Sequence, residues 1–79
     1  MLPWPGRFFV YPREPAVRGD DVRAWQTRMR EHQFAVSVDG IYGPESKRAC
    51  VALQKDAGLD PDGIVGRATW DATFEPQIG

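Results

Sequence analysis

Few residues in this 79-residue chain carry side chains that could act as a nucleophile or a base. The sequence contains one histidine, one cysteine and two serines, whereas a serine or cysteine triad needs a nucleophile, a base and an orienting group in one place. His32 falls near the end of a charged helical stretch, where a cation would complement the helix dipole. Cys50 lies in an apolar helical pattern that is typical of a small buried side chain. The sequence therefore predicts no such catalytic centre.

Metal-binding patterns are also incomplete in the sequence. A zinc site needs three or four N, S or O ligands at characteristic spacing, and the chain has no such set. Asp60, Asp62 and Gly63 resemble the start of a calcium-binding loop, but Thr69 stands where that loop needs a glutamate. Paired carboxylates that cleave a glycoside need a pocket around them, and no pocket-forming scaffold is evident. We therefore expect no metal, no cofactor and no enzymatic activity from this chain alone.

A stretch around an Asp-Gly pair occurs twice, 23 residues apart, at residues 38–46 and 61–69. In each copy the pair predicts a tight turn whose glycine can adopt a positive φ, and an isoleucine follows as an apolar plug. A second glycine then stands at the N-cap position of a helix. Ser46 and Thr69 come three residues after that glycine, and we expect their hydroxyls to reach back to the cap as in a capping box.

The periodicity of the chain predicts three helices, at residues 20–32, 44–57 and 67–74. The first helix has an inner face formed by Val22, Trp25, Gln26 and Met29. The second begins at Pro44 and ends before Gly58, which suits the left-handed position of a Schellman motif. Residues 22–26 and 50–54 share the pattern apolar-x-Ala-apolar-Gln, so the first two helices look like copies with the same inner face. Residues 34–38 alternate in polarity and predict a short extended segment.

These elements predict an all-α fold, a small orthogonal three-helix bundle that displays the two Asp-Gly loops together. We expect the three-helix domain to span residues 19–79 and residues 1–18 to form an extended N-terminal arm. The arm holds four of the seven prolines, which excludes a helix, and its aromatic residues favour packing of Phe9 and Tyr11 onto the helices. A frayed linker is the alternative for residues 1–7.

Charge and hydropathy exclude several classes of partner. The formal net charge of −1, with both signs interspersed, provides no basic face for DNA or RNA, and the short third helix has too few basic residues to read either. No apolar run approaches the roughly 18 residues of a membrane span. The N-terminus lacks a charged region followed by an apolar one, so no signal peptide is expected. We expect a monomer.

Four motifs follow one another at characteristic spacing. They are Asp-Val-Arg-x-Trp-Gln from residue 21, Val-Asp-Gly-Ile-Tyr-Gly-Pro-x-Ser from residue 38, Leu-Gln at residue 53, and Gly-Leu-x-x-Asp-Gly-Ile-Val-Gly-x-x-Thr-Trp from residue 58. Together they resemble the peptidoglycan-binding domain family, the three-helix module of cell-wall hydrolases, across residues 19–74. The Pro-Trp-Pro-Gly-Arg lead is more weakly similar to the wall-binding modules of endolysins from phages of actinobacteria. Gln33 stands where the family often has glycine, and a left-handed backbone there would carry roughly 1 kcal/mol of strain.

The resemblance implies that the chain binds cell-wall peptidoglycan, by its glycan or its stem peptide, without cleaving it. It also implies that the chain is part of a larger hydrolase (an endolysin) and targets it to its substrate at the bacterial cell wall, with holin-dependent release if it is phage-derived. The alternative is a protein–protein interaction or prodomain-like module that docks on a catalytic domain. A prodomain of this family would place a loop cysteine on the catalytic zinc, whereas Cys50 is predicted in mid-helix.

The two Asp-Gly loops are the predicted binding surface. Their glycines let a ligand approach the backbone, and each loop leads into a helix N-terminus that favours a carboxylate. Tyr42 is expected to offer a ring and a hydroxyl, and the charged residues to offer ion pairs. The predicted ligand-binding residues are Asp39, Gly40, Ile41, Tyr42, Gly43, Asp62, Gly63, Ile64, Gly66 and Arg67. The structural alternatives are that the two aspartates only cap their own turns and that Trp25 and Trp70 belong to the core.

Overall fold

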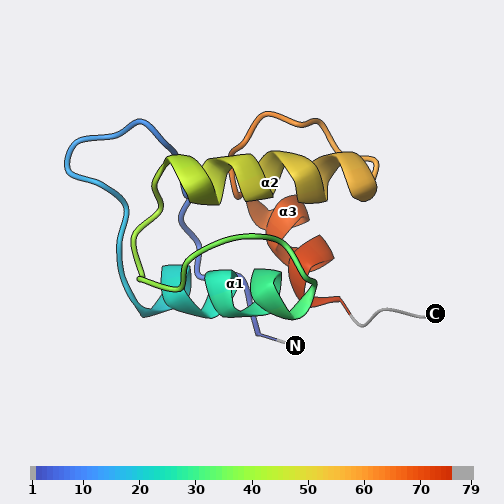
Figure 1. Cartoon of the computed structure of the whole chain (residues 1–79), viewed down its shortest axis with the longest axis horizontal. Coiled ribbons are helices and arrows are strands. Elements are labelled where there is room, and N and C mark those ends of the chain that lie inside the picture. Colours follow the sequence, from blue (N-terminus) through green and yellow to red (C-terminus); the bar gives the residue numbers. More distant parts are fainter. Residues whose placement is uncertain (1, 76–79) are drawn as a thin grey trace.

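The computed structural model of the chain describes residues 2–75, which form three helices. Helix α1 spans Asp20–Glu31, α2 spans Pro44–Asp56 and α3 spans Arg67–Phe74. Helix α3 packs against both of the others, and Figure 1 shows it crossing behind α1 and α2. The predicted all-α three-helix fold is confirmed, with α1 and α2 each ending one residue earlier than predicted. Within residues 2–75, none of these helices is long and apolar enough to cross a membrane.

The extended segment predicted at residues 34–38 does not form a strand. Strand-like pairing in the described residues is limited to two isolated bridges, Phe9 with Val65 and Arg18 with Ile41. Both bridges join the N-terminal arm to one of the two loops. Residues 34–38 cross from the end of α1 to the first loop (Figure 1), and Val36 is buried in the core on the way.

The N-terminal arm lies against the helices as predicted for Phe9 and Tyr11. Phe9 is fully buried, its N–H donates to the Val65 carbonyl at 3.1 Å, and the Val65 N–H returns a bond of 3.0 Å. Tyr11 is half-buried and packs on the same core. Near the start of the arm, the Leu2 carbonyl accepts a 2.9 Å hydrogen bond from the Trp70 indole. Hydrogen bonds at Leu2 and at Phe9 therefore join the arm to α3 and to the second loop.

The centre of the core is a cluster of four aromatic rings. Phe9 contacts Trp25, Tyr42 and Trp70, with ring centroids 6.4, 5.8 and 6.0 Å apart. Three of these rings come from the arm, α1 and α3, and the fourth comes from the first loop. Trp25 and Trp70 are thus core residues, as the helical spacing indicated. Cys50 is also fully buried, and burial raises the pKa of its thiol to about 11.

Helices α1 and α2 end in the same Schellman geometry, but with different residues in the left-handed position. Gln33 has φ of 71°, and the next N–H, that of Phe34, donates to the Met29 carbonyl at 3.0 Å. Gly58 has φ of 73° in the equivalent place. The strain expected at Gln33 is therefore present, whereas glycine avoids it at the end of α2.

This pair of helix ends gives a matched test of backbone strain. We expect Gln33→Gly to raise the free energy of unfolding by about 1 kcal/mol. Gly58→Gln should lower it by a similar amount, because a Cβ at Gly58 meets open space and only the backbone conformation is unfavourable. Urea denaturation of both variants measures the two shifts. Shifts of the same sign would show that contacts of the glutamine side chain outweigh the backbone term.

An ion pair fastens the arm to the start of α1. The Arg7 guanidinium donates from Nε to Asp21 Oδ2 and from Nη2 to Asp21 Oδ1, both at 2.7 Å. It also donates to the Arg18 carbonyl. The hydrogen bonds from Arg7 lower the pKa of the Asp21 carboxyl below its usual value.

We expect this pair to give the domain an acid-sensitive increment of stability. Because the folded-state pKa of Asp21 is depressed, the increment is complete above the unfolded pKa of about 3.9. It is lost as the pH falls through the lower folded-state pKa. Arg7 is about half exposed, so the increment should not exceed about 1 kcal/mol.

Thermal unfolding between pH 7 and pH 2 tests this expectation. Asp21→Asn should destabilise the protein at pH 7 and flatten the acid limb of the curve, while Asp20→Asn, on the adjacent exposed residue, should leave the shape of that limb unchanged. An acid limb that is identical in wild type and Asp21→Asn would contradict the assignment.

Candidate functional site

The first Asp-Gly loop is held by the side chain of Gln26, which is fully buried on α1. Its amide nitrogen lies within hydrogen-bond distance of Asp39 Oδ1 (3.1 Å), the Ile41 carbonyl (2.9 Å) and Ser46 Oγ (3.0 Å). Its amide oxygen accepts the N–H groups of Asp39 (3.1 Å) and Gly40 (2.8 Å). One glutamine therefore connects α1, the loop and the start of α2.

The second loop is held in the same way by Gln54 of α2, which is almost fully buried. The Gln54 amide nitrogen lies 2.9 Å from Asp62 Oδ1, 3.0 Å from the Ile64 carbonyl and 3.0 Å from Thr69 Oγ1. Its amide oxygen accepts the Gly63 N–H at 2.9 Å. We refer to these two arrangements as the glutamine clamps. Each copy of the repeat seen in the sequence therefore corresponds to one Asp-Gly loop held by one buried glutamine.

The clamps replace the capping boxes that were predicted at Ser46 and Thr69, and that prediction is wrong. The N-cap residues of α2 and α3, Gly43 and Gly66, receive no side-chain hydrogen bond. The two hydroxyls instead lie within hydrogen-bond distance of the buried glutamine amides. A buried amide needs acceptors for its N–H groups, and this demand outweighs the local bond to the helix cap.

Both loop aspartates shape their own turns. Asp39 Oδ1 accepts the Ile41 N–H at 3.0 Å, and Asp62 Oδ1 accepts the Ile64 N–H at the same distance. For Asp39, the bond from the Ile41 N–H is the largest cause of a lowered pKa, and the Gln26 amide adds to it. The alternative of turn-capping aspartates therefore holds in the structure, although both residues remain exposed.

Tyr42 does not offer its ring to a ligand, and this part of the predicted site is corrected. The residue is fully buried within the aromatic cluster of the core. Its hydroxyl donates to the Gly63 carbonyl at 2.7 Å, and its N–H donates to the Val17 carbonyl at 2.8 Å. Burial raises the pKa of the Tyr42 hydroxyl well above its usual value, so it stays protonated as a donor. Tyr42 joins the first loop to the second and to the arm.

The other predicted site residues divide by exposure. Gly40 and Gly63 are buried under the clamps, and Gly43, Ile64 and Gly66 are half-buried. The exposed members are Asp39, Ile41, Asp62 and Arg67. The exposed residues lie in two separate hollows, one beside each loop, and not in one shared cleft.

The first-loop hollow has a volume of about 280 Å³ and is lined by Arg18, Gly19, Asp20, Arg23, Asp39, Gly40 and Ile41. The second-loop hollow has a volume of about 270 Å³. It is lined by Phe8, Gln54, Leu59, Asp60, Asp62, Ile64, Gly66, Arg67, Ala68 and Thr69. Phe8 comes from the arm, so the second-loop hollow is completed by a residue far from the loop in sequence.

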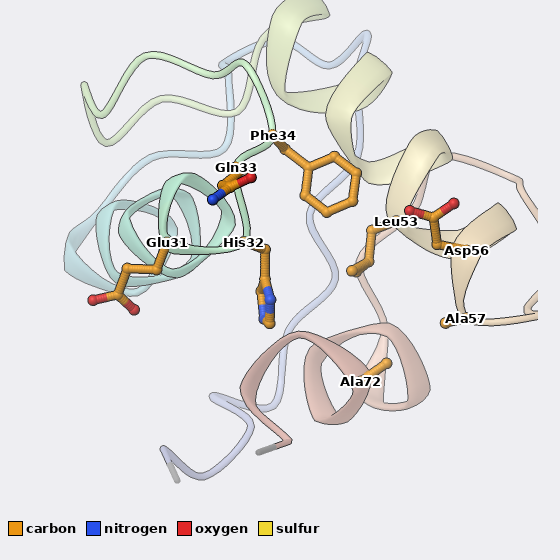
Figure 2. A pocket seen from close by; sticks show the side chains of 8 residues that line it. All are labelled: Glu31, His32, Gln33, Phe34, Leu53, Asp56, Ala57 and Ala72. Atoms are coloured by element: carbon orange, nitrogen blue, oxygen red, sulfur yellow. The ribbon is translucent and has the colours of Figure 1, made fainter. Parts of the chain in front are cut away.

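A third hollow, of about 390 Å³, lies where the three helices approach one another at the end of α1. Figure 2 shows the Phe34 ring and the Leu53 side chain on one side of it and His32 extending toward α3. The Glu31 carboxylate points away from the hollow in this view. His32 Nε2 lies 2.7 Å from the Thr73 carbonyl, which gives this histidine a structural hydrogen bond between α1 and α3.

The matched family is described as "Putative peptidoglycan binding domain" and covers residues 18–72. The chain belongs to this peptidoglycan-binding domain family. A solved structure of a peptidoglycan-binding protein from Clostridioides difficile, in complex with glutamine hydroxamate, superposes with a TM-score of 0.69 at 38% identity. The match covers 71% of this chain and 35% of that one.

Two curated relatives share the same region. A "Probable N-acetylmuramoyl-L-alanine amidase" of Bacillus licheniformis is 43% identical over 56 residues, which are 67% of this chain and 16% of the relative. An uncharacterized protein of Kitasatospora aureofaciens is 41% identical over 54 residues, which are 66% of this chain and 46% of the relative. This peptidoglycan-binding domain therefore spans less than half the length of the curated relatives that it matches.

The residues that build the loops of this peptidoglycan-binding domain were visible in the sequence only in part. The matching pentapeptides placed Gln26 and Gln54 on equivalent inner faces, but a polar residue on an inner face did not reveal its partners. The described residues contain no group of three or more His, Cys, Asp or Glu arranged to hold a metal ion. Cys50 is buried in α2, so its thiol is not available to a metal centre of another domain.

The clamp geometry predicts that Gln54→Leu destabilises the domain severely. Leucine fills the space but leaves the Gly63 N–H and the Ile64 carbonyl without their partner, and each such group costs about 1–3 kcal/mol. Thr69→Val removes only one of the amide's acceptors and should cost about 1 kcal/mol. Chemical denaturation measures the free energy of unfolding of both variants, and the loss in Gln54→Leu should be the larger. Equal stability losses would mean that the clamp is not the main support of the second loop.

Proposed function

We propose that this chain binds bacterial cell-wall peptidoglycan without cleaving it and holds an attached hydrolase at the wall. The observation that carries the proposal is the family match over residues 18–72. Both Asp-Gly loops of the chain are hydrogen-bonded to their glutamine clamps. The amidase among its relatives supports a hydrolase as the attached partner. The Pro-Trp-Pro-Gly-Arg lead supports an endolysin of a phage of actinobacteria, released to the wall through a holin.

The chemistry of the chain supports binding rather than catalysis. The Cys50 thiol is buried and its pKa is raised to about 11, which disfavours the reactive thiolate. The His32 imidazole is bonded to the Thr73 carbonyl and takes part in packing of α1 against α3. The exposed groups of the two loops are of the kind that hold a ligand: two carboxylates, an isoleucine side chain and a guanidinium.

The proposed contact surface consists of the exposed members of the two loops, Asp39, Ile41, Asp62 and Arg67. Peptidoglycan presents sugar faces, amides, carboxylates and amino groups. The Arg67 side chain is 77% exposed and makes only a long ion pair of 3.8 Å with Asp71, so its guanidinium is available to a carboxylate or carbonyl. The exposed aspartates can accept from amides or an amino group. We propose that the chain acts as a monomer.

Pelleting with purified sacculi tests the proposal. We expect the chain to sediment with sacculi and to release no soluble fragments from them. Arg67→Ala should weaken sedimentation about fivefold, as for the loss of a contact worth about 1 kcal/mol. It should stay as stable as wild type to within about 0.5 kcal/mol, since the residue is exposed.

Arg30→Ala, at an exposed arginine of α1 that borders none of the hollows described above, is the matched control and should bind as wild type does. Display of many copies on beads raises apparent affinity without a new contact and makes weak binding measurable. Wild-type protein that fails to sediment in both formats, with sacculi from several bacterial classes, would refute peptidoglycan binding by this chain.

A further inference from the structure

The largest exposed apolar side chains of the described residues gather on the N-terminal arm. Leu2 is 47% exposed and Phe8 is 56% exposed, while the third member of this class, Ile41, is on the first loop. Leu2 lines a hollow of about 460 Å³ together with Pro3, Trp4, Arg67 and Asp71. We call it the arm hollow, and its volume falls in the range of about 300–1,000 Å³ that is usual for ligand sites.

The arm hollow and the second-loop hollow adjoin. Arg67 lines both of them, and the Trp4 ring of one contacts the Phe8 ring of the other edge-on, with centroids 5.7 Å apart. The result is a strip with two aromatic side chains along it and one guanidinium between its two halves. Trp4 and Phe8 precede the region that the family match covers, so the two aromatic side chains of the strip lie outside the matched region.

Phe8 is exposed, yet the structure provides a seat for it. A Cβ added at Gly66 would come within 2.9 Å of the Phe8 ring. The backbone of Gly66 has φ of −104°, which any residue adopts, so the absence of a side chain there serves the ring and not the turn. Gly43, at the same place in the first repeat, has nothing within 4 Å of such a Cβ. The two copies of the repeat therefore differ at the point where Phe8 docks.

The arm that carries Phe8 is also rigidly held. Phe9, the next residue, is fully buried and exchanges two backbone hydrogen bonds with Val65. At the other end of the strip, the Trp70 indole holds the Leu2 carbonyl at 2.9 Å. Rings that are fixed before a ligand arrives lose little conformational entropy on binding.

Trp4 differs from the other two tryptophans in its hydrogen bonding. The indole N–H of Trp25 donates to Thr73 Oγ1 and that of Trp70 donates to the Leu2 carbonyl. The Trp4 N–H is enclosed, and within residues 2–75 it has no acceptor. A buried indole N–H normally has a partner, and Trp4 is the exception among the three tryptophans in the described residues.

We propose that this strip is the subsite for the glycan strand of peptidoglycan, an inference that rests on the proposed function. Sugar rings have apolar C–H faces and polar edges. The faces match the rings of Phe8 and Trp4, and the hydroxyl and N-acetyl groups at the edges match the Arg67 and Asp71 side chains.

The lining of the strip favours the glycan over the stem peptide. Its charged side chains are the Arg67 guanidinium and the carboxylates of Asp60, Asp62 and Asp71, so the strip has a net negative charge that disfavours the free carboxylates of a stem peptide. The exposed area is dominated by apolar side chains, which fits the repeated faces of neighbouring sugar rings along one strand.

Competition for sacculus binding tests the glycan subsite in the whole 79-residue chain. The probes are soluble glycan strands freed of stem peptides by an amidase, and soluble stem peptides. Glycan strands should release wild-type protein from sacculi, and stem peptides at the same concentration should not. Sacculus binding that stem peptides release and glycan strands do not would overturn the subsite and leave the proposed function intact. Absence of any sacculus binding would refute the proposed function itself.

Variants at Phe8 test whether a ring is the recognised group. Phe8→Leu keeps an apolar side chain without a ring and should weaken binding of glycan strands about fivefold. Phe8→Trp keeps a ring and should stay within about twofold of wild type. Wild-type affinity for glycan strands in Phe8→Leu would overturn the stacking role.

Gly66→Ala gives a second, independent displacement of the same ring. It should weaken glycan binding to a similar degree, because its Cβ occupies the seat of Phe8. Gly43→Ala is the control, because it makes the same change at the equivalent N-cap, where no ring is displaced. A larger fall in melting temperature in Gly66→Ala than in Gly43→Ala would therefore report the displaced Phe8 ring. Full glycan affinity in a folded Gly66→Ala variant would contradict the claim that docking of the Phe8 ring on Gly66 is needed for binding.

Discussion

Two buried glutamine side chains set the geometry of this small domain. Each satisfies the backbone of an Asp-Gly loop and at the same time reaches a hydroxyl on the helix that follows. A loop that turns inward buries N–H and C=O groups, and those groups must be paired if the fold is to be stable. Because one primary amide can donate two hydrogen bonds and accept two, Gln26 and Gln54 meet most of this demand from a single position. The loops can then be short and can approach the core closely.

The clamps also determine what the loops leave for a ligand. Their glycines and the Tyr42 ring are turned inward, so the exposed groups are the outer faces of the aspartates, an isoleucine and Arg67. The arm then makes the two loops unequal. It pairs with both through backbone bonds, but it lines only the second-loop hollow with an aromatic side chain. The two copies of the repeat thus form similar loops, but only the second-loop hollow has an aromatic side chain in its lining.

Much of the fold followed from local patterns in the sequence, and the parts that did not follow depend on contacts distant in sequence. Helix positions, the left-handed Gln33 and the burial of Cys50 were predictable from periodicity and turn chemistry, because each is decided within a few residues. Tyr42 was misassigned because its loop context suggested exposure, and only the approach of Phe9 and Gly63 encloses it. Phe8 was missed as a site residue because no local pattern links an arm residue to Gly66. The capping boxes failed for the same reason, since the competing glutamines lie on other helices.

The separation of these contacts along the chain bears on the order in which the domain assembles. The glutamine clamps close short segments, with Gln54 and Asp62 only 8 residues apart and Gln26 and Asp39 13 apart. The arm contacts are the least local, and the bond from Trp70 to Leu2 spans 68 residues. Loop-closure entropy favours early formation of the short segments, so the arm docks onto helices and loops that are already in place. In a chain emerging from the ribosome, the N-terminal arm therefore waits for the last helix before Phe9 can be enclosed.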